Sequence, residues 1–361
     1  MKKIIPAILT VIILIAFISV VARHSSAAEL KKYNFRYATF YHPDGWGAIH
    51  SIKPWFEQVE KATNGQIVFE PYWSGSLAKA ESAWGSLQKG IVDVGDVSFH
   101  NTPGLVVLHN VITLPFLNYQ SAEHESIVTW KLYENFQEIQ NEYKDNKILL
   151  FSVSTPFFFV SNKKQIKSRE DFKGLKTRAV GGECLQYMVE LAGGIPVSMP
   201  GSESYSALEK GVIDAASANW SNLLQMRIYE VAKYYFFGPF NAGARGVCMS
   251  HQAWNSLTPD LQQKIMSVSG LEGSRFWSRT EFDASAINGR EKVKSEGYEL
   301  NESVLSPEKI KEWKDLDGEK IWNAWIKLAV KKAKEQKCPE PEALVKRIIS
   351  STEELIEANR K

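Results

Sequence analysis

Residues 86–94 of the chain are Ser-Leu-Gln-Lys-Gly-Ile-Val-Asp-Val, and residues 207–215 repeat the pattern as Ala-Leu-Glu-Lys-Gly-Val-Ile-Asp-Ala. In each copy a segment with helical periodicity ends at Lys-Gly, two β-branched residues follow, and an aspartate comes next. Glycine readily adopts the left-handed conformation that ends a helix, and β-branched residues favour a strand. Each copy therefore predicts a crossover from a helix to a buried strand.

The two copies indicate two similar α/β lobes. A solenoid would need at least three repeats with a period of about 20 to 50 residues. Elsewhere strand patterns alternate with helix patterns, which predicts a mainly parallel sheet in each lobe. We assign residues 29–155 and about 243–295 to lobe I, and residues 156–242 and about 296–361 to lobe II with long C-terminal helices. Because the chain crosses between the lobes more than once, we expect a hinge and a cleft.

Residues 1–28 have the pattern of a signal peptide. A basic start at residues 1–3 precedes the apolar run 4–21, and Ser-Ala-Ala at residues 26–28 supplies the small side chains that a signal peptidase recognises. We expect cleavage before Glu29 and export of the remaining chain. A retained membrane anchor is the alternative, since an apolar run of about 18 residues approaches the length that spans a bilayer.

The charge balance argues against a nucleic-acid partner. The chain has 43 Lys plus Arg and 41 Asp plus Glu, which give a formal charge of +2. Cleavage would remove Lys2, Lys3 and Arg23 and leave a charge of about −1. An anionic ligand would therefore have to be captured by a local site and not by a basic surface.

No common enzyme signature occurs in the sequence, neither a Walker loop nor a GxGxxG, GxSxG or HExxH motif. The seven His are scattered, and Cys184, Cys248 and Cys338 lie far apart without the spacing of metal ligands. We therefore expect no catalytic residues, no metal and no cofactor. One disulfide and three buried thiols both remain open.

Residues 172–182 contain the one local arrangement with clear binding chemistry. Arg178 ends a predicted strand, and glycines at residues 181–182 precede a helix that is predicted to start near Glu183. Such a turn gathers free N–H groups at the positive end of a helix dipole, and a guanidinium can bind a carboxylate or sulfonate with two hydrogen bonds. The pattern favours a site for an organic anion, with an arginine on a basic surface stretch as the alternative.

Further segments complete an ordered set across the chain. They are Trp-Ser-Gly-Ser-Leu at 73–77, Lys-Gly-Ile-Val-Asp-Val at 89–94, Asp-Phe-Lys-Gly-Leu-Lys-Thr-Arg at 171–178, Gly-Ile-Pro-Val-Ser-Met at 194–199, Glu-Ser-Tyr-Ser-Ala-Leu at 203–208, Gly-Val-Ile-Asp at 211–214 and Leu-Thr-Pro-Asp-Leu-Gln at 257–262. In this set the sequence resembles the periplasmic solute-binding subunit of TRAP transporters, the DctP family. The resemblance covers essentially the whole mature chain. It implies the two-lobe fold of periplasmic binding proteins, a small organic acid enclosed between the lobes, and delivery to an ion-driven membrane permease. We also expect a monomer.

The resemblance implies a set of ligand-binding residues. Arg178 matches the arginine that clamps the ligand carboxylate in this family. Family position further suggests Tyr41, His42, Trp73, Asp96 and His100 from lobe I. Asn219 and Trp220, after the second repeat, stand in for a contact that the family usually makes through a Glu, and Phe158 at the hinge is a candidate for an apolar wall. For each of these the alternative is a turn or core residue.

Two departures from the family pattern concern the ligand. Many members have a Glu where this chain has Ser217, and some have a second Arg about twenty residues before the clamp, where this chain has Thr-Pro-Phe-Phe-Phe at 155–159. The three Phe are either strand core or an apolar wall of the site. We expect a small monoanion, namely a 2-oxo, 2-hydroxy or aromatic carboxylate or a sulfonate such as isethionate. A dicarboxylate-binding subunit, a receptor that feeds a sensor kinase, and an enzyme that uses the same cleft are the alternatives.

Overall fold

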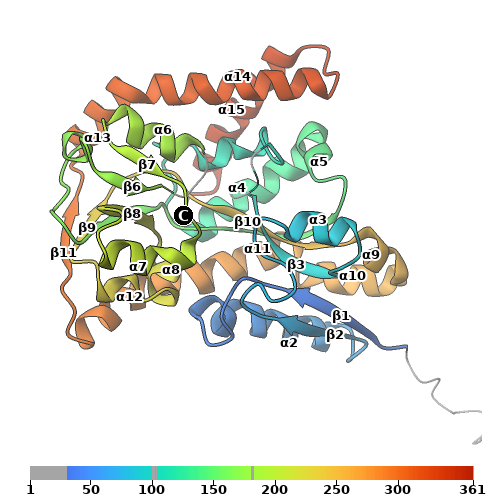
Figure 1. Ribbon diagram of the computed structural model, residues 1–361. Helices are drawn as coiled ribbons and strands as arrows, with labels where there is room; N and C mark the ends of the chain where they lie inside the picture. Colours follow the sequence, from blue (N-terminus) through green and yellow to red (C-terminus); the bar gives the residue numbers. More distant parts are fainter. Residues whose placement is uncertain (1–30, 100–101, 103, 180–182, 361) are drawn as a thin grey trace, which may run out of the picture.

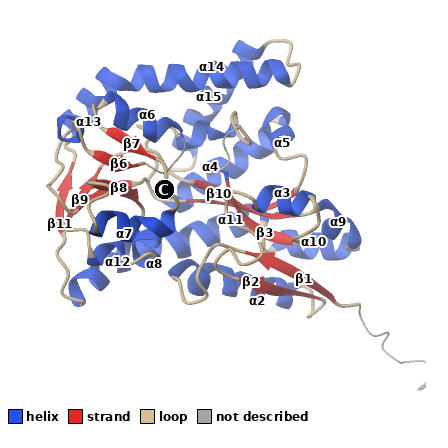
Figure 2. Ribbon diagram, in the orientation of Figure 1, coloured by secondary structure: helices blue, strands red, loops and turns tan. Residues whose placement is uncertain are grey.

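The computed structural model describes residues 31–99, 102, 104–179 and 183–360. The predicted signal peptide and His100 lie outside these residues. Within them, the strands form a five-stranded sheet and a six-stranded sheet, which occupy the two halves of the molecule (Figures 1 and 2). Below, lobe I is the part built around the five-stranded sheet, and lobe II is the part built around the six-stranded sheet.

The sheet of lobe I has the order β2 (Ile67–Tyr72), β1 (Tyr33–Ala38), β3 (Val94–Ser98), β10 (Ala244–Met249) and β4 (Lys147–Val153). The sheet of lobe II has the order β11 (Asn301–Val304), β9 (Tyr234–Phe237), β5 (Phe158–Ser161), β8 (Ala215–Ala218), β6 (Lys176–Arg178) and β7 (Ile195–Val197). In lobe I, β10 runs against its neighbours, and in lobe II, β5 does. Each reversed strand is the one by which the chain arrives from the other lobe. The expected parallel sheets are therefore mixed at the strands that cross the hinge.

The repeated motif forms a helix-to-strand crossover in both lobes. α3 (Ala83–Gln88) precedes β3, and α7 (Ser204–Glu209) precedes β8. Gly90 and Gly211 have φ of 66° and 68°, the left-handed conformation expected after a helix. Each strand begins directly after the aspartate, later than the β-branched pair suggests, and only the second residue of each pair is buried.

The aspartates of the motif have the same role in both lobes. Asp93 accepts a hydrogen bond from the backbone N–H of Arg36 at 2.9 Å, and Asp214 accepts one from the backbone N–H of Lys176 at 2.9 Å. Arg36 and Lys176 lie on β1 and β6, the parallel neighbours of the strands that follow the motif. The motif is thus repeated because each aspartate joins its crossover to the next strand of the sheet.

Helices cover both faces of each sheet (Figure 2). Before β5 these are η1 (Ala48–Ile52), α2 (Lys53–Ala62), α3, η3 (His109–Thr113), α4 (Ala122–Asn135) and α5 (Gln137–Glu142). Between β5 and β10 they are η4 (Arg169–Phe172), α6 (Glu183–Leu191), η5 (Gly201–Glu203), α7, α8 (Trp220–Gln225) and η6 (Ile228–Glu230). After β10 they are α9 (His251–Ser256), α10 (Pro259–Ser267), α11 (Gly270–Ser278), η7 (Arg279–Asp283), α12 (Ala284–Ser295), α13 (Pro307–Trp313), η8 (Lys314–Gly318), α14 (Glu319–Glu335) and α15 (Pro341–Ala358).

The three consecutive Phe at the start of lobe II alternate between the two faces of its sheet. Phe157 and Phe159 join the apolar cluster with Phe172 and Trp313, whereas Phe158 joins the cluster on the opposite face. Each of the three is at most 2% exposed. This alternation is the period of two that a strand imposes, and it makes all three side chains part of the core.

The C-terminal helices contact both lobes. Trp313 and Ile321 pack in the core of lobe II, whereas Trp325 of α14 and Leu344 of α15 pack in the core of lobe I. The indole Nε1 of Trp325 donates a hydrogen bond to the carbonyl of Val107 at 2.9 Å. In Figure 1, α14 extends along one side of the molecule from α13 toward α5. Trp313 and Trp325 therefore have a packing role.

One continuous helical segment joins the lobes. α11 packs on β4 and α4 in lobe I, and α12 packs on α8 in lobe II. The short π-helix η7 lies between them without a break in the helical backbone. Side chains on η7 are therefore placed where the two lobes meet.

Candidate functional site

Arg178 is a buried cation at the C-terminal end of β6. Arg178 is 8% exposed, and its Nε donates a hydrogen bond to the carbonyl of Met199 at 3.2 Å. Burial lowers the pKa of its guanidinium to about 10. Among the described residues, no carboxylate lies within ion-pair distance of it. Such a group is costly to bury unless an anion accompanies it.

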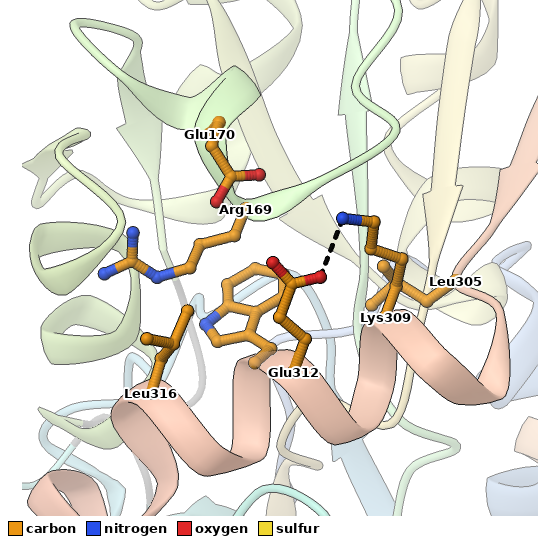
Figure 3. A pocket seen from close by; sticks show the side chains of 7 residues that line it. Arg169, Glu170, Leu305, Lys309, Glu312 and Leu316 are labelled. Carbon is orange, nitrogen blue, oxygen red and sulfur yellow. Dashed lines mark hydrogen bonds and ion pairs between the residues drawn. The ribbon is translucent and has the colours of Figure 1, made fainter.

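Two other buried or partly buried arginines, unlike Arg178, form ion pairs with a carboxylate of the protein. Arg169 pairs with Asp317 through Nε at 2.5 Å, and Arg245 pairs with Glu281 through Nη2 at 2.8 Å. The cavity beside Arg169, between η4 and α13, measures only about 10 Å³, enough for one water molecule (Figure 3). These two arginines are neutralised within the protein, whereas no carboxylate among the described residues pairs with Arg178.

The space beside the Arg178 guanidinium is kept open by a glycine. A Cβ added to Gly201 would lie 3.2 Å from Nη2 of Arg178 and 2.8 Å from Cε of Met226. Gly201 does not have a positive φ, so its role is to leave room and not to form a special turn. The helix predicted near Glu183 begins at that residue, but the glycines before it lie outside the described residues.

Asn219 lies near Arg178 at the same edge of the lobe II sheet. It follows β8, which is the parallel neighbour of β6, and the C-terminal ends of such strands form the usual ligand crevice of α/β folds. Its side-chain oxygen caps α8 by accepting a hydrogen bond from the N–H of Asn222 at 2.9 Å. The expected contact of Asn219 with a ligand stays a prediction.

Trp220 and Phe158 are core residues of lobe II. Both are 2% exposed, and their rings pack against each other with centroids 5.2 Å apart. Trp220 also stacks on Tyr235, and the guanidinium of Arg290 lies 5.0 Å from its ring. Their expected contact with ligand stays a prediction, and the packing alternative accounts for their present positions.

The expected lobe I residues lie in different surroundings. Tyr41 and Asp96 are buried, 1% and 4% exposed, and His42 is exposed. Trp73 is half-buried, with the ammonium of Lys53 located 5.7 Å from its ring. His42 lines a groove of about 730 Å³ whose walls come from both lobes. The groove is lined by His42, Asp44, Gly45, Trp46, Ile49 and His50 from lobe I and by Leu224, Gln225, Arg227, Tyr229, Lys292, Glu296 and Tyr298 from the other side.

A buried polar network next to this groove was not predicted from the sequence. The hydroxyl of Tyr41 donates a hydrogen bond to Glu281 and accepts one from Arg245. The Arg245 guanidinium lies 5.0 Å from the rings of both Tyr41 and Phe282. Burial alone would lower the pKa of Arg245, but the charge of Glu281 raises it overall. The available sequence signal is an arginine inside the otherwise apolar strand 244–249.

Asp96 should make the stability of the folded chain fall as the pH rises. Burial raises the pKa of its carboxyl to about 6, above the value near 3.9 of an unfolded chain. Between these values the folded chain binds more protons than the unfolded chain, so the free energy of unfolding decreases with pH by about 3 kcal/mol. We expect Asp96→Asn to flatten the profile of Tm between about pH 4 and 6. An equal slope in both proteins would contradict this assignment.

The described part of the chain contains neither a metal cluster nor a membrane span. No group of three or more His, Cys, Asp or Glu among these residues is arranged to hold a metal ion. Within the same residues, no helix is both long enough and apolar enough to cross a bilayer. No disulfide joins Cys184, Cys248 and Cys338 in the structure; Cys248 is buried, whereas Cys184 and Cys338 are half-buried.

The sequence model of the DctP family, described as bacterial extracellular solute-binding protein, family 7, matches residues 42–327. The chain belongs to the DctP family. This family comprises solute-binding receptors of TRAP transporters for small organic acids, whose members are periplasmic or extracytoplasmic. The predicted family and two-lobe α/β fold are thereby confirmed.

Among DctP relatives, the monocarboxylate 2-oxoacid-binding periplasmic protein of Nostoc sp. is 29% identical over 266 residues, covering 69% of this chain and 68% of that protein. A TRAP solute-binding protein from Rhodoferax ferrireducens, crystallised with copurified benzoate, has a TM-score of 0.80 at 24% identity, covering 91% of this chain and 98% of that one. A marine metagenome TRAP protein specific for aromatic acid ligands, bound to 3-hydroxybenzoate, has a TM-score of 0.81 at 24% identity, covering 92% and 100%. At this identity the two structures establish the DctP fold and leave the ligand open.

Proposed function

We propose that this DctP protein captures a small organic monoanion between its lobes and delivers it to a TRAP-type membrane permease. The observation that carries the proposal is the buried guanidinium of Arg178, which has no carboxylate partner among the described residues. The ligand carboxylate, or a sulfonate, would supply the missing charge through two parallel hydrogen bonds. The protein acts in the periplasm after loss of residues 1–28, and it acts as a monomer.

The charge of the site supports one anionic group on the ligand. Where some relatives have a second arginine, this chain has the buried strand β5 with Phe158 and Phe159. A second carboxylate on the ligand would have to be desolvated without a matching cation, which costs several kcal/mol. Aromatic carboxylates and 2-oxo acids are the first candidates, because relatives with these ligands share the fold and the family.

The proposal is tested by thermal unfolding of the mature chain with a panel of acids. The panel contains benzoate, 3-hydroxybenzoate, mandelate, pyruvate, isethionate and succinate. A ligand at 100 times its Kd adds about 2.7 kcal/mol to the free energy of unfolding, which raises Tm by roughly 5 to 10 °C for a domain of this size. Benzamide, which has the shape of benzoate without its charge, is the matched control and should leave Tm unchanged.

Each result of the panel separates the proposed function from an alternative. A shift with a monoanion and none with benzamide supports the proposal. A larger shift with succinate than with any monoanion would instead identify a dicarboxylate-binding protein. Turnover of a bound acid would identify an enzyme, and binding without uptake by cells that contain the cognate permease would favour a sensory receptor.

A further inference from the structure

Glu281 occupies the junction of the two lobes. It lies on η7, in the middle of the continuous helical segment from α11 to α12, and it is 0% exposed. A carboxylate at such a position needs several donors to offset the loss of water. The donors that it receives come from both lobes.

Lobe I provides the fixed part of this arrangement. Arg245 of β10 donates to Oε2 of Glu281 at 2.8 Å, Trp277 of α11 donates to the same oxygen at 2.8 Å, and the Tyr41 hydroxyl donates to Oε1. The residue before Glu281 is held as well, because the indole Nε1 of Trp46 donates to the carbonyl of Thr280 at 3.2 Å. These contacts attach the η7 turn to lobe I.

Lobe II provides one donor to the same carboxylate. The Ser221 hydroxyl donates to Oε1 of Glu281 at 3.1 Å. Ser221 is 0% exposed and is the second residue of α8, which follows Asn219 and the C-terminal end of β8. The bond therefore links the lobe I network to the helix that starts at the candidate ligand site.

We propose that Glu281 is a positioning residue for lobe closure, with Ser221 as the contact that forms when lobe II closes on lobe I. This inference rests on the proposed function, because capture and release of a ligand require the lobes to close and reopen. Neither residue needs to touch the ligand. The hydrogen bond to a buried carboxylate retards reopening, so its loss accelerates ligand release without slowing capture.

Ser221→Ala is the variant that tests the proposal. Removing the Glu281 carboxylate would leave Arg245 buried without its counter-ion and could prevent folding, whereas Ser221→Ala removes only the lobe II donor. Ser126→Ala is the matched control, because Ser126 is also 0% exposed and its hydroxyl bonds only within α4, to the carbonyl of Glu123 at 2.8 Å. Both variants of the mature chain are compared with the parent.

The first measurement needs no ligand. Amide hydrogen exchange of peptides covering residues 41–50 and 220–229 reports how often the lobe contact opens. We expect exchange about threefold faster or more in Ser221→Ala and unchanged in Ser126→Ala. Equal exchange in Ser221→Ala and the parent would overturn the proposal, whether or not any organic acid binds.

The second measurement uses benzoate as the probe in stopped-flow experiments. We expect the dissociation rate constant of Ser221→Ala to rise about tenfold, which corresponds to about 1.4 kcal/mol, with the association rate constant within about twofold of the parent. A lower Tm with an unchanged dissociation rate would assign Ser221 a merely structural role and overturn the proposal. Failure of the parent to bind benzoate would count against the aromatic part of the proposed function and leave the exchange result to decide on Ser221.

Discussion

Replacing Arg178 by Met should abolish ligand binding while the free protein keeps or gains stability. The guanidinium would lose a paired anion in the complex, and truncating one partner of a buried hydrogen-bonded pair costs about 2 to 5 kcal/mol, or roughly 30-fold to several thousand-fold in Kd. In the free protein the same guanidinium is buried without a carboxylate among the described residues. Exchange of an uncompensated buried charge for an apolar side chain should raise the free energy of unfolding by about 1 to 3 kcal/mol.

Arg169→Met is the matched control for this prediction. Arg169 is paired with Asp317, whose carboxylate is 0% exposed, so the same substitution leaves this buried charge with only the more distant Lys320, at 3.6 Å, as its partner. We expect Arg169→Met to lower the free energy of unfolding and to leave the affinity for the organic acid unchanged. Calorimetric titration and urea unfolding of both variants separate the two effects. The clamp assignment fails if Arg178→Met binds the best acid of the panel within threefold of the parent.

The opposite expectations for these two arginines show what local sequence can and cannot reveal. Arg178 could be proposed as an anion ligand from the sequence because its strand, the following glycines and the helix start at Glu183 are contiguous in the chain. The counter-ion of a buried arginine can come from a residue that is far away in the sequence. Asp317, for example, follows Arg169 by 148 positions in the chain. Local patterns therefore identify a candidate anion site, but only the fold shows that its charge is unmatched.

The same distinction holds for the fold. The repeated Lys-Gly motif predicted the two crossovers because glycine conformation and β-branching act over a few residues. The reversed strands β5 and β10 were not predictable from pattern, since a strand has the same period of two in either direction. Likewise, the period of a strand predicts that the neighbouring Phe at 157–159 point to opposite faces of the sheet. It does not predict that helices cover both of these faces and bury all three side chains.

Arg245→Met should strongly destabilise the folded chain. It leaves Glu281, which is 0% exposed, without the cation that donates to Oε2 at 2.8 Å. Removal of one partner of a buried ion pair costs about 3 to 5 kcal/mol, because the remaining charge stays desolvated. Urea unfolding should show this as a lower midpoint with an unchanged slope, since the surface exposed on unfolding is the same.

The double variant Arg245→Met/Glu281→Gln separates the cost of the unmatched charge from the cost of lost packing. Glutamine keeps the shape of the carboxylate and carries no charge that requires Arg245. Its oxygen can take the Oε2 position and accept from Trp277, and its NH₂ can take the Oε1 position and donate to the Tyr41 hydroxyl. We therefore expect the double variant to recover about half or more of the stability lost in Arg245→Met. A double variant less stable than Arg245→Met would mean that the network acts mainly through hydrogen-bond geometry. Because Ser221 donates to the same carboxylate, the charge pair that stabilises lobe I also determines how firmly lobe II is held against it.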